Sequence, residues 1–182
     1  MSRASVSTVR AAHTADLDAA TLTQARALLV QAFEGDFSDH DWEHSLGGIH
    51  ALAYHDGDLV GHASVVQRRL LHGGRALRCG YVEGVGVRPE ARRRGHADAM
   101  MEALERVVRR AYDLGALAAT DMAAPFYAGR GWQPWRGPTS ALSPSGVVRT
   151  PEEDGSIYVL PVDIPLDLEG ELTCDWRNGD VW

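Results

Sequence analysis

The chain has 182 residues, of which 45% are hydrophobic and 24% charged, which suits one compact domain with a buried core. Its formal net charge of −7 argues against a nucleic-acid partner, which needs a basic face, and permits a cationic ligand. An acidic surface that only keeps the protein soluble is the alternative. The two cysteines make no disulfide framework, and neither a signal peptide nor an apolar run of membrane-spanning length is found. We therefore expect a cytoplasmic protein without a membrane partner.

The first third of the chain predicts one strand and two helices. Residues 5–13 are β-prone, and Asp18 is the expected N-cap of a helix that Gly35 ends. A second, short helix is expected after an N-cap at Ser38 or Asp39. The first helix carries an apolar stripe with helical spacing, made of Leu22, Ala25, Leu28, Leu29 and Phe33.

The middle of the chain predicts three strands and then the strongest helix. The strands cover residues 49–55, 59–71 and 77–87, with glycine-containing turns between them. The helix covers residues 97–112, and Gly115 is its expected end signal. Its apolar face is expected to consist of Met100, Met101, Leu104, Val107, Val108 and Ala111. Its polar face is expected to consist of Glu102, Glu105, Arg106, Arg109 and Arg110.

The last third predicts shorter elements. A strand is expected over residues 116–119, a short helix over 123–130 and a strand over 156–162. Residues 134–151 are rich in Gly, Pro and Ser and predict a loop with at most one strand. The tail, residues 171–182, contains large apolar side chains and is expected to be ordered.

The resulting order of elements is β-α-α-β-β-β-α-β-α-β-β. This order alternates too irregularly for a doubly wound parallel sheet. It favours an α/β (α+β) fold in which helices cover both faces of a mixed sheet. Because no repeat or linker interrupts the chain, residues 1–182 are predicted to form a single domain.

The most informative segment for function joins the third strand to the long helix, with the sequence VGVRPEARRRGHA over residues 85–97. A glycine-containing turn there delivers backbone N–H groups to a helix N-terminus, which is a ready anion site. Gly95 allows close approach of a phosphate, and the arginines before it add charged donors. A solvated arginine loop is the alternative. The preceding strand, Pro89 and the amphipathic helix together favour the anion site.

Two motifs resemble the GNAT superfamily of N-acetyltransferases. Val87–Ala97 resembles its acetyl-CoA signature, V-x-P-x-x-R-x-x-G-x-[GA], and residues 126–132, FYAGRGW, resemble its second marker, F-Y-x-x-x-G-[WF]. Beyond them, the chain resembles the bacterial aminoglycoside 2'-N-acetyltransferases over almost its whole length. The matching stretches include residues 35–37, 41–48, 76–83 and 174–182.

The resemblance implies a GNAT fold, whose mostly antiparallel mixed sheet is splayed at the acetyl-CoA site. It implies acetyl-CoA as co-substrate and no metal. A backbone N–H near Val85 would polarise the thioester carbonyl, an oxyanion-type contact worth ~3–4 kcal/mol in the transition state. The residues implied to bind acetyl-CoA are Val85, Gly86, Val87, Arg92, Arg93, Arg94, Gly95, His96 and Ala97.

The resemblance also implies two catalytic residues. An amine with a pKa of about 8 is mostly protonated at neutral pH, so acetylation needs a base. Glu83 is the candidate, acting directly or through a water; a strand glutamate paired with an arginine is the alternative. Tyr127 stands in the position of the tyrosine that donates a proton to the departing CoA sulfur; a tyrosine that is merely packed is the alternative.

The implied substrate is a polycationic aminoglycoside acetylated at its 2' amine, because each charged amine can pair with a carboxylate. Two departures from the family pattern concern this site. Ala118-Ala119 stands where serines are frequent, and Glu153 stands where aspartate is usual. The residues implied to face the substrate are Asp36, Asp41, Glu83, Glu153, Asp180 and Trp182 with its terminal carboxylate.

Other residues carry weaker signals. His40 and His44 have metal-ligand spacing but no identifiable third ligand, and Cys79 is expected in the core rather than as a nucleophile. Trp132 and Trp135 suit either sugar stacking or core packing.

Three rival functions remain open at the sequence level. The chain could acetylate another amine, such as a kasugamycin-like aminosugar, a polyamine or a metabolite. It could be a non-catalytic GNAT-like sensor, which the retained Glu83 and Tyr127 argue against. A protein-lysine acetyltransferase would need a groove rather than a pocket. GNAT enzymes are often dimers, so a homodimer is also open, although the sequence carries no interface signature.

Overall fold

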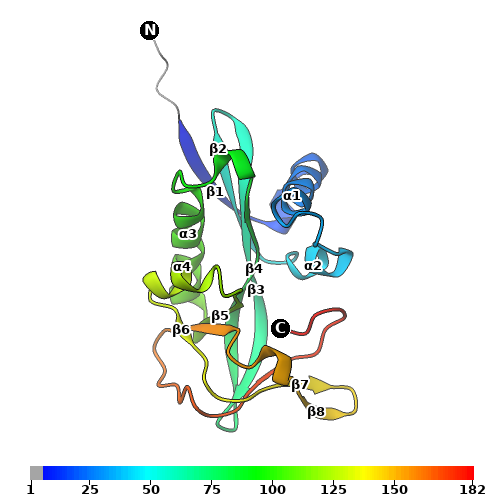
Figure 1. Ribbon diagram of the computed structural model, residues 1–182, viewed down its shortest axis with the longest axis vertical. Helices are drawn as coiled ribbons and strands as arrows, with labels where there is room; N and C mark the ends of the chain where they lie inside the picture. The colour runs from blue at the N-terminus through cyan, green and yellow to red at the C-terminus, as the bar shows by residue number, and fades with distance from the viewer. Residues whose placement is uncertain (1–5) are drawn as a thin grey trace. The chain divides into compact units, whose positions relative to one another are not determined.

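The computed structural model describes residues 6–182, so Ser5 of the expected first strand lies outside the described residues (Figure 1). The helices are η1 (Thr14–Asp16), α1 (Ala19–Ala32), α2 (Asp39–His44), η2 (Pro89–Ala91), α3 (His96–Ala111), α4 (Ala124–Gly129) and η3 (Pro151–Glu153). The strands are β1 (Ser7–His13), β2 (Ile49–His55), β3 (Asp58–His72), β4 (Arg75–Val87), β5 (Leu114–Ala118), β6 (Gln133–Pro134), β7 (Thr139–Ser143), β8 (Gly146–Arg149), β9 (Ile157–Pro161) and β10 (Leu172–Cys174).

The chain folds into two compact units, each described here by itself. Unit 1 contains the described residues up to Val66 together with Val82–Arg106, and unit 2 contains Gln67–Tyr81 and Val107–Trp182. The boundaries fall inside β3, β4 and α3, so these three elements contribute to both units.

Strands β1 to β4 of unit 1 lie side by side in chain order. β1 pairs antiparallel with β2, and β2 pairs antiparallel with β3, with an irregularity at Ala53/Tyr54. Alternate residues of these strands face α1, where Leu52 and Leu59 pack against Leu28 and Leu29 in one buried cluster. The period-2 pattern of the sheet and the helical stripe of α1 therefore meet in a shared core.

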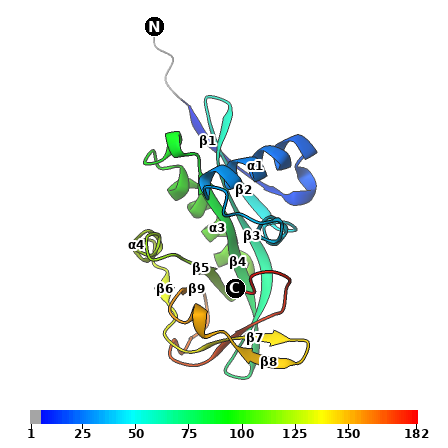
Figure 2. The same cartoon turned by 45° about the vertical axis from the view of Figure 1, so that its right-hand side comes forward.

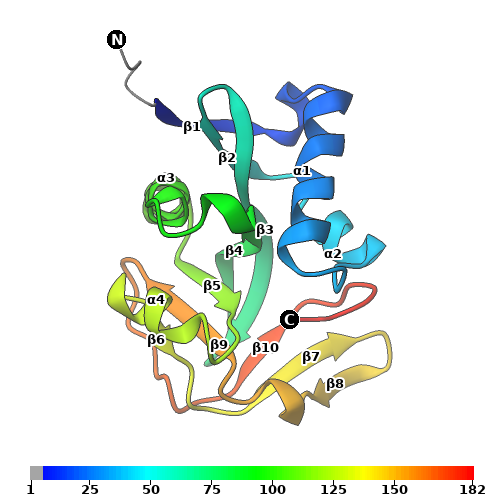
Figure 3. The ribbon, with the colours of Figure 1, turned by 45° about the horizontal axis from the view of Figure 1, so that its top comes forward.

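Helices cover both faces of the unit 1 strands, as predicted. α1 and α2 lie on one side and α3 on the other (Figures 1 and 3). The glycines of the sheet show the same division. A Cβ at Gly61 would meet the Met100 side chain of α3, whereas a Cβ at Gly86 would meet Leu29 and Ala32 of α1.

The predicted helix caps are confirmed. Asp18 is the N-cap of α1, and its side chain accepts a hydrogen bond from the Thr21 N–H at 2.7 Å. Ser38 is the N-cap of α2 and forms a reciprocal capping box with Asp41. Two residues of α3 depart from the prediction. Ala111, expected on the apolar face, is exposed, and Glu105, expected on the polar face, is only 4% exposed. Glu105 follows Met101 by one helical turn, and so it falls on the edge of the buried stripe.

In unit 2 the strands follow the order β6-β9-β5-β4-β3-β10-β7-β8. Figure 2 labels the strands of this order other than β10. β4–β5 and β10–β7 are parallel pairs, whereas β5–β9, β6–β9, β7–β8 and β10–β3 are antiparallel. Together with the antiparallel pairs of unit 1, this is the predicted mixed, mostly antiparallel pattern.

Two expectations for unit 2 are wrong in detail, whereas the expectation of an ordered tail is confirmed. Residues 134–151 contain two strands, the β7–β8 hairpin, rather than at most one, and the tail contains β10 beside β7 (Figure 3). Gly115 does not end a helix, because it lies inside β5. A Cβ on Gly115 would come within 2.9 Å of the Trp132 ring, so the residue permits close packing and is not a helix stop.

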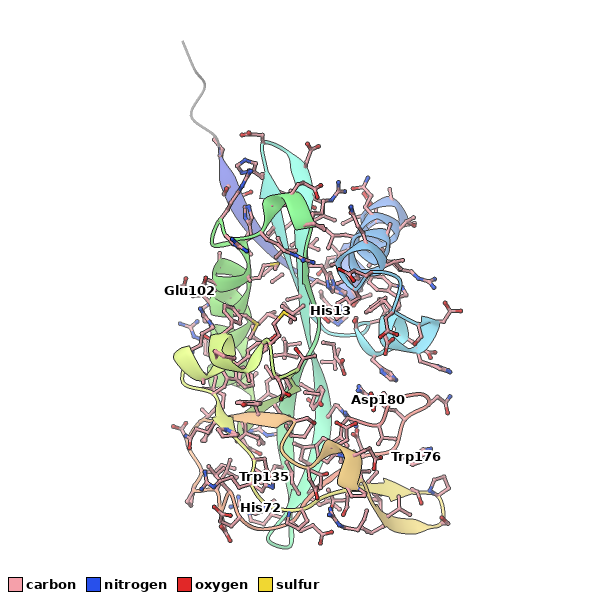
Figure 4. The ribbon with its side chains drawn as sticks, viewed as in Figure 1. His13, His72, Glu102, Trp135, Trp176 and Asp180 are labelled. Atoms are coloured by element: carbon pink, nitrogen blue, oxygen red, sulfur yellow. The ribbon has the colours of Figure 1, made fainter. Side chains whose placement is uncertain are left out.

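Trp132 and Trp135 are 2% and 0% exposed, which decides for core packing over sugar stacking. The Trp135 indole N–H donates to the Gly170 carbonyl at 3.0 Å, and its ring meets the His72 ring edge-on (Figure 4). Cys79 is fully buried in β4, as expected for a core residue.

Replacing Gly115 with alanine is expected to lower the free energy of unfolding by ~1–3 kcal/mol, because overpacking strains a rigid core. The added Cβ would meet Trp132 Cη2 at 2.9 Å and Val108 Cγ1 at 3.1 Å. Urea unfolding measures the change. The matched control is Gly129→Ala, where no atom lies within 4 Å of the new Cβ and a gain of up to about 1 kcal/mol is expected. Equal effects of the two substitutions would contradict the packing argument.

Within residues 6–182, no helix is both long and apolar enough to cross a membrane.

Candidate active site

The predicted catalytic strand segment lies in unit 1, at the C-terminal end of β4. The β4–β5 ladder ends at the pair Tyr81↔Ala116, although β4 continues to Val87. This early end agrees with the expected splay of the sheet. Glu83 and Val85 are both half-buried, and the Ser64 hydroxyl donates to the Glu83 carbonyl at 3.4 Å.

Gly84, between Glu83 and Val85, has a left-handed backbone conformation with φ +56°. A Cβ at this position would also lie 2.7 Å from the Ser45 hydroxyl oxygen. Both observations require glycine here. The conformation interrupts the regular alternation of the strand at the residue that separates the candidate base from the candidate oxyanion donor.

The turn after β4 leads directly into α3, as predicted. Arg93 has φ +61° and Gly95 has φ +80°, after which α3 begins at His96. Arg93 and Arg94 are exposed, so their guanidinium groups are accessible to an anion. A Cβ at Gly95 would have open space around it, so the backbone conformation rather than crowding favours glycine.

Arg92 has a structural role that the sequence did not reveal. Its Nε donates to the Val87 carbonyl at 3.2 Å and its Nη2 donates to the Ala32 carbonyl at 3.0 Å. The guanidinium thus joins the end of β4 to the C-terminus of α1, where it also complements the negative end of the helix dipole.

The side chain of His96 points into the interior. Its ring is 4% exposed and packs edge-on against the His55 ring, with centroids 5.7 Å apart. Burial, followed by the charges of His55 and Arg94, lowers the pKa of His96. An anion at the start of α3 would therefore meet the backbone N–H groups of His96 and the half-buried Ala97 rather than the imidazole.

Two of the predicted substrate-facing carboxylates belong to unit 1. Asp36 is exposed in the segment between α1 and α2. Asp41 is held by the capping box: its Oδ2 accepts from the Ser38 N–H at 2.7 Å and from the Ser38 hydroxyl at 2.8 Å. One face of the Asp41 carboxylate is thus fixed by α2 itself.

Tyr127 lies in α4 of unit 2 and is 7% exposed. Its ring meets the rings of Phe126 and Trp132 edge-on, with centroid distances of 5.1 and 6.2 Å. Burial raises the pKa of Tyr127 to about 12, so the phenol is protonated at neutral pH. Next to α4, the Thr120 hydroxyl accepts from the Ala123 N–H at 3.3 Å.

Glu153 and Asp180 are brought together in unit 2. Glu153 is half-buried, and its Oε2 accepts from the Ser156 hydroxyl at 2.8 Å. Burial raises the pKa of Glu153, and the negative charges of Asp180 and Glu152 raise it further against the lowering effect of Ser156. A carboxylate whose pKa is raised by a second carboxylate favours a cationic ligand.

The tail that carries Asp180 is held in a defined position (Figure 4). Arg68, only 4% exposed, donates through Nε to Asp175 Oδ1 at 2.7 Å and through Nη2 to the Val181 carbonyl at 2.6 Å. The Trp182 indole N–H donates to the Thr150 hydroxyl at 2.9 Å, and the Trp182 main-chain oxygen accepts from Arg177 at 2.8 Å. Sequence reasoning missed Arg68, whose partners are about a hundred residues away along the chain.

Replacing Glu153 with glutamine is expected to stabilise the protein at pH 7 but not at pH 4. The folded state raises the pKa of this carboxyl above its ordinary value of 4.5, so the wild type loses stability as the pH rises from that value through the folded pKa. Glutamine stays neutral and escapes that loss. Urea unfolding at the two pH values measures the difference. The exposed Glu102→Gln is the control, and an equal gain at both pH values for Glu153→Gln would contradict this linkage.

Sequence reasoning also missed two buried histidines in unit 1. His50 and His62 are each fully buried and share a 2.8 Å hydrogen bond between His50 Nδ1 and His62 Nε2. The period-2 alternation of the strands could have predicted their burial, because both histidines lie on the same face of the sheet as the buried Leu52.

The comparisons with known proteins agree with this arrangement. Residues 9–135 match the family described as "Acetyltransferase (GNAT) domain". A protein of Mycolicibacterium fortuitum named aminoglycoside 2'-N-acetyltransferase is 58% identical over 179 residues, covering 96% of this chain and 92% of that protein.

Two solved structures share the fold at low identity. A GNAT family acetyltransferase from Brucella melitensis in complex with acetyl-CoA aligns with a TM-score of 0.61 at 15% identity, over 92% of this chain and 94% of that chain. Eis1 from Mycobacterium abscessus aligns with a TM-score of 0.60 at 21% identity, over 74% of this chain, which spans 33% of that larger chain. The chain therefore belongs to the GNAT superfamily of acetyltransferases, as a member of its aminoglycoside 2'-N-acetyltransferase family.

Proposed function

We propose that the chain transfers an acetyl group from acetyl-CoA to the 2' amine of aminoglycoside antibiotics, by direct attack in a ternary complex, and thereby confers resistance. The observation that carries the proposal is the 58% identity, over 96% of the chain, to the aminoglycoside 2'-N-acetyltransferase of M. fortuitum. The Glu83-Gly84-Val85 segment and the turn into α3 supply local geometry that suits this chemistry.

Acetyl-CoA is the acyl donor, and the turn between β4 and α3 suits its diphosphate. The first N–H groups of α3 have no partner within the helix and carry the positive end of its dipole. Arg93 and Arg94 are exposed beside them, and Gly95 leaves open space on its Cβ side. Val85, Gly86 and Val87 are proposed to pair with the pantetheine through their backbone groups.

In the proposed reaction, a nitrogen–carbon bond forms as the carbon–sulfur bond of the thioester breaks. Glu83 accepts the proton that the attacking amine must lose, directly or through a water. The Val85 N–H donates to the carbonyl oxygen as negative charge develops there. Tyr127 donates its phenolic proton to the departing sulfur, which its raised pKa of about 12 permits because the phenol is protonated at neutral pH.

The antibiotic is proposed to bind through its charged amines. Asp36, Asp41, Glu153 and Asp180 supply carboxylates, and Trp182 supplies its main-chain oxygen. The raised pKa of Glu153 supports this assignment, because an ammonium group would relieve the repulsion from Asp180. Glu153→Gln should accordingly weaken aminoglycoside binding by roughly 1.5–3 kcal/mol, the range for a hydrogen bond to a charged group.

A cytoplasmic location and a homodimer are also proposed. Both cysteines, Cys79 and Cys174, are buried thiols outside any disulfide, which is compatible with a reducing compartment. Cell fractionation tests the location. Light scattering on the purified chain tests the dimer, and a monomer mass at micromolar concentration would overturn it.

The decisive experiment compares two antibiotics that differ at one position. Kanamycin B carries a 2' amine, whereas kanamycin A carries a 2' hydroxyl. Incubation with acetyl-CoA should add one acetyl group to kanamycin B, which NMR should locate on the 2' nitrogen, and should release CoA thiol. Kanamycin A should stay unmodified. Acetylation of both antibiotics, or of neither while a polyamine or another aminosugar turns over, would overturn the assignment.

A further inference from the structure

His50 and His62 form a buried pair beside the segment of β4 proposed to catalyse acetyl transfer. His50 lies on β2 opposite Ser64, and His62 lies on β3 opposite Leu52, so the two histidines are diagonal neighbours on one face of the sheet. Each is 0% exposed. The contact between them is one link in a longer chain of hydrogen bonds.

That chain runs from the loop after α2 to β4. The Gly47 N–H donates to the Thr14 hydroxyl oxygen at 2.8 Å, and this hydroxyl lies 2.7 Å from His50 Nε2. At the other end, His62 Nδ1 lies 2.7 Å from the Gly84 carbonyl oxygen. Five segments of unit 1 are therefore joined through two imidazole rings: η1, the loop after α2, β2, β3 and β4.

The donor and acceptor in each hydrogen bond follow from the group at the end of the chain, the Gly84 carbonyl. A carbonyl oxygen only accepts, so His62 Nδ1 carries a proton and donates to Gly84. In neutral His62, Nε2 then accepts from His50 Nδ1–H, and His50 Nε2 accepts from the Thr14 hydroxyl. Burial lowers the pKa of both histidines to about 4, so both rings are neutral at pH 7. Each nitrogen and the hydroxyl has a partner in this single arrangement.

The chain ends on the residue whose conformation interrupts β4. Gly84 has φ +56°, and the position of a Cβ there would lie 3.4 Å from His62 Cε1. The residues on either side are Glu83, the proposed base, and Val85, the proposed oxyanion donor. The Gly84 carbonyl and the Val85 N–H belong to one peptide plane, so a rotation of this plane would move the Val85 N–H directly. It would affect Glu83 through the backbone torsions of Gly84, which link this plane to the preceding one.

We propose that His50 and His62 are positioning residues, which hold the Gly84 carbonyl so that Glu83 and the Val85 N–H keep their orientation for acetyl transfer. This rests on the proposed function for its catalytic consequence. A misplacement of about 1 Å in such groups is enough to slow a reaction ~10²-fold. Thr14 has the subordinate role of donating its hydroxyl proton to His50 Nε2, whose tautomer the Gly84 carbonyl already sets through His62.

The test uses two polar replacements that differ in which imidazole nitrogen they reproduce. In His62→Asn, the amide nitrogen occupies the place of Nδ1 and can still donate to Gly84. In His62→Gln, the longer side chain places its amide near Nε2 and loses that donor. His62→Leu removes both. We expect His62→Gln and His62→Leu to lower kcat roughly 10²-fold, with the Kd for acetyl-CoA near the wild-type value, and His62→Asn to retain most of kcat.

Hydrogen exchange supplies a readout that needs no catalysis. The amides of Glu83, Gly84 and Val85 should exchange faster in His62→Gln and His62→Leu than in the wild type and His62→Asn. Leu59→Ala, in the core of the same unit, is the control for loss of stability. It should lower Tm, as His62→Leu does, but it should not lower kcat when the rate is expressed per acetyl-CoA-binding site.

If His62→Leu had the same kcat and the same amide exchange rates as the wild type, the proposal would be overturned. A loss of kcat that follows the loss of Tm equally in His62→Asn, His62→Gln and Leu59→Ala would also overturn it. If the wild type acetylates no aminoglycoside, the proposed function fails. Faster exchange of the Glu83, Gly84 and Val85 amides in His62→Gln than in His62→Asn would then still show that the histidines position the Gly84 carbonyl. Equal exchange in the two variants would refute that positioning role.

Discussion

Replacing Glu83 with glutamine is expected to lower kcat by roughly 10²- to 10⁴-fold, the usual contribution of a general base. Glutamine keeps the size of the side chain and its place next to Gly84 but cannot accept a proton. The Kd for acetyl-CoA should stay unchanged, because the donor is proposed to bind through the backbone of β4 and the turn after it. Steady-state rates of CoA thiol release and calorimetry with acetyl-CoA measure the two quantities.

The pH dependence adds a second readout for Glu83. Without a base, the variant depends on the amine that is already deprotonated in solution, so its kcat/KM should rise about tenfold per pH unit toward an amine pKa of about 8. Glu102→Gln, on the exposed face of α3, is the control and should keep wild-type rates. A Glu83→Gln enzyme as fast as the wild type at pH 7 would show that another group removes the proton.

Tyr127→Phe is expected to lower kcat by ~10²- to 10⁴-fold through loss of the general acid. The departing CoA sulfur would leave as an unprotonated thiolate. Phenylalanine preserves the edge-on contacts with Phe126 and Trp132, so the fold of α4 should be retained. Because burial raises the pKa of Tyr127 to about 12, the wild type should not lose this proton donor between pH 7 and pH 10.

The measurement is kcat across that pH range for both enzymes. Tyr54→Phe, a partly buried tyrosine packed on the core of unit 1, controls for the general effect of removing a hydroxyl. If Tyr127→Phe and Tyr54→Phe were equally active, the sulfur would need no proton from Tyr127. Its position in the family motif would then reflect packing alone.

Local signals in the sequence were enough for most of unit 1. Asp18 and Ser38 cap their helices because an N-cap needs only a short polar side chain and the following N–H groups. The turn before α3 was predictable for a similar reason, since Gly95 and the amphipathic helix after it are adjacent in the chain. Such features depend on contacts within a few residues.

The failures depend on contacts between distant residues. The β7–β8 hairpin is not predicted because the Pro, Ser and Gly residues at its turn give a stronger loop signal than the four residues of β8 give a strand signal. The three-residue β10 is defined only by its pairing with β3 and β7. Gly115 resembles a helix stop in the sequence, and only its contact with the distant Trp132 explains why glycine stands there.

The candidate site shows the same limit. Motifs predict Glu83, Tyr127 and the acetyl-CoA residues. They do not predict the contacts of His62 with Gly84 or of Arg68 with the tail. His62 acts on Gly84 across neighbouring strands, and Arg68 acts on a tail about a hundred residues away. Motifs identify groups that carry chemistry, but the side chains that orient those groups need no fixed spacing from them.

The capping box of α2 limits how the substrate range of this enzyme can evolve. If Asp41 binds an antibiotic amine, a mutation there that admits a new drug also removes the acceptor of the Ser38 N–H, and losing that hydrogen bond costs about 0.5–1.5 kcal/mol. Within residues 6–182 no hydrogen bond to the Asp36 carboxylate is found, so mutation at Asp36 carries no such penalty. Selection by successive antibiotics should therefore accumulate changes at Asp36 before it reaches Asp41.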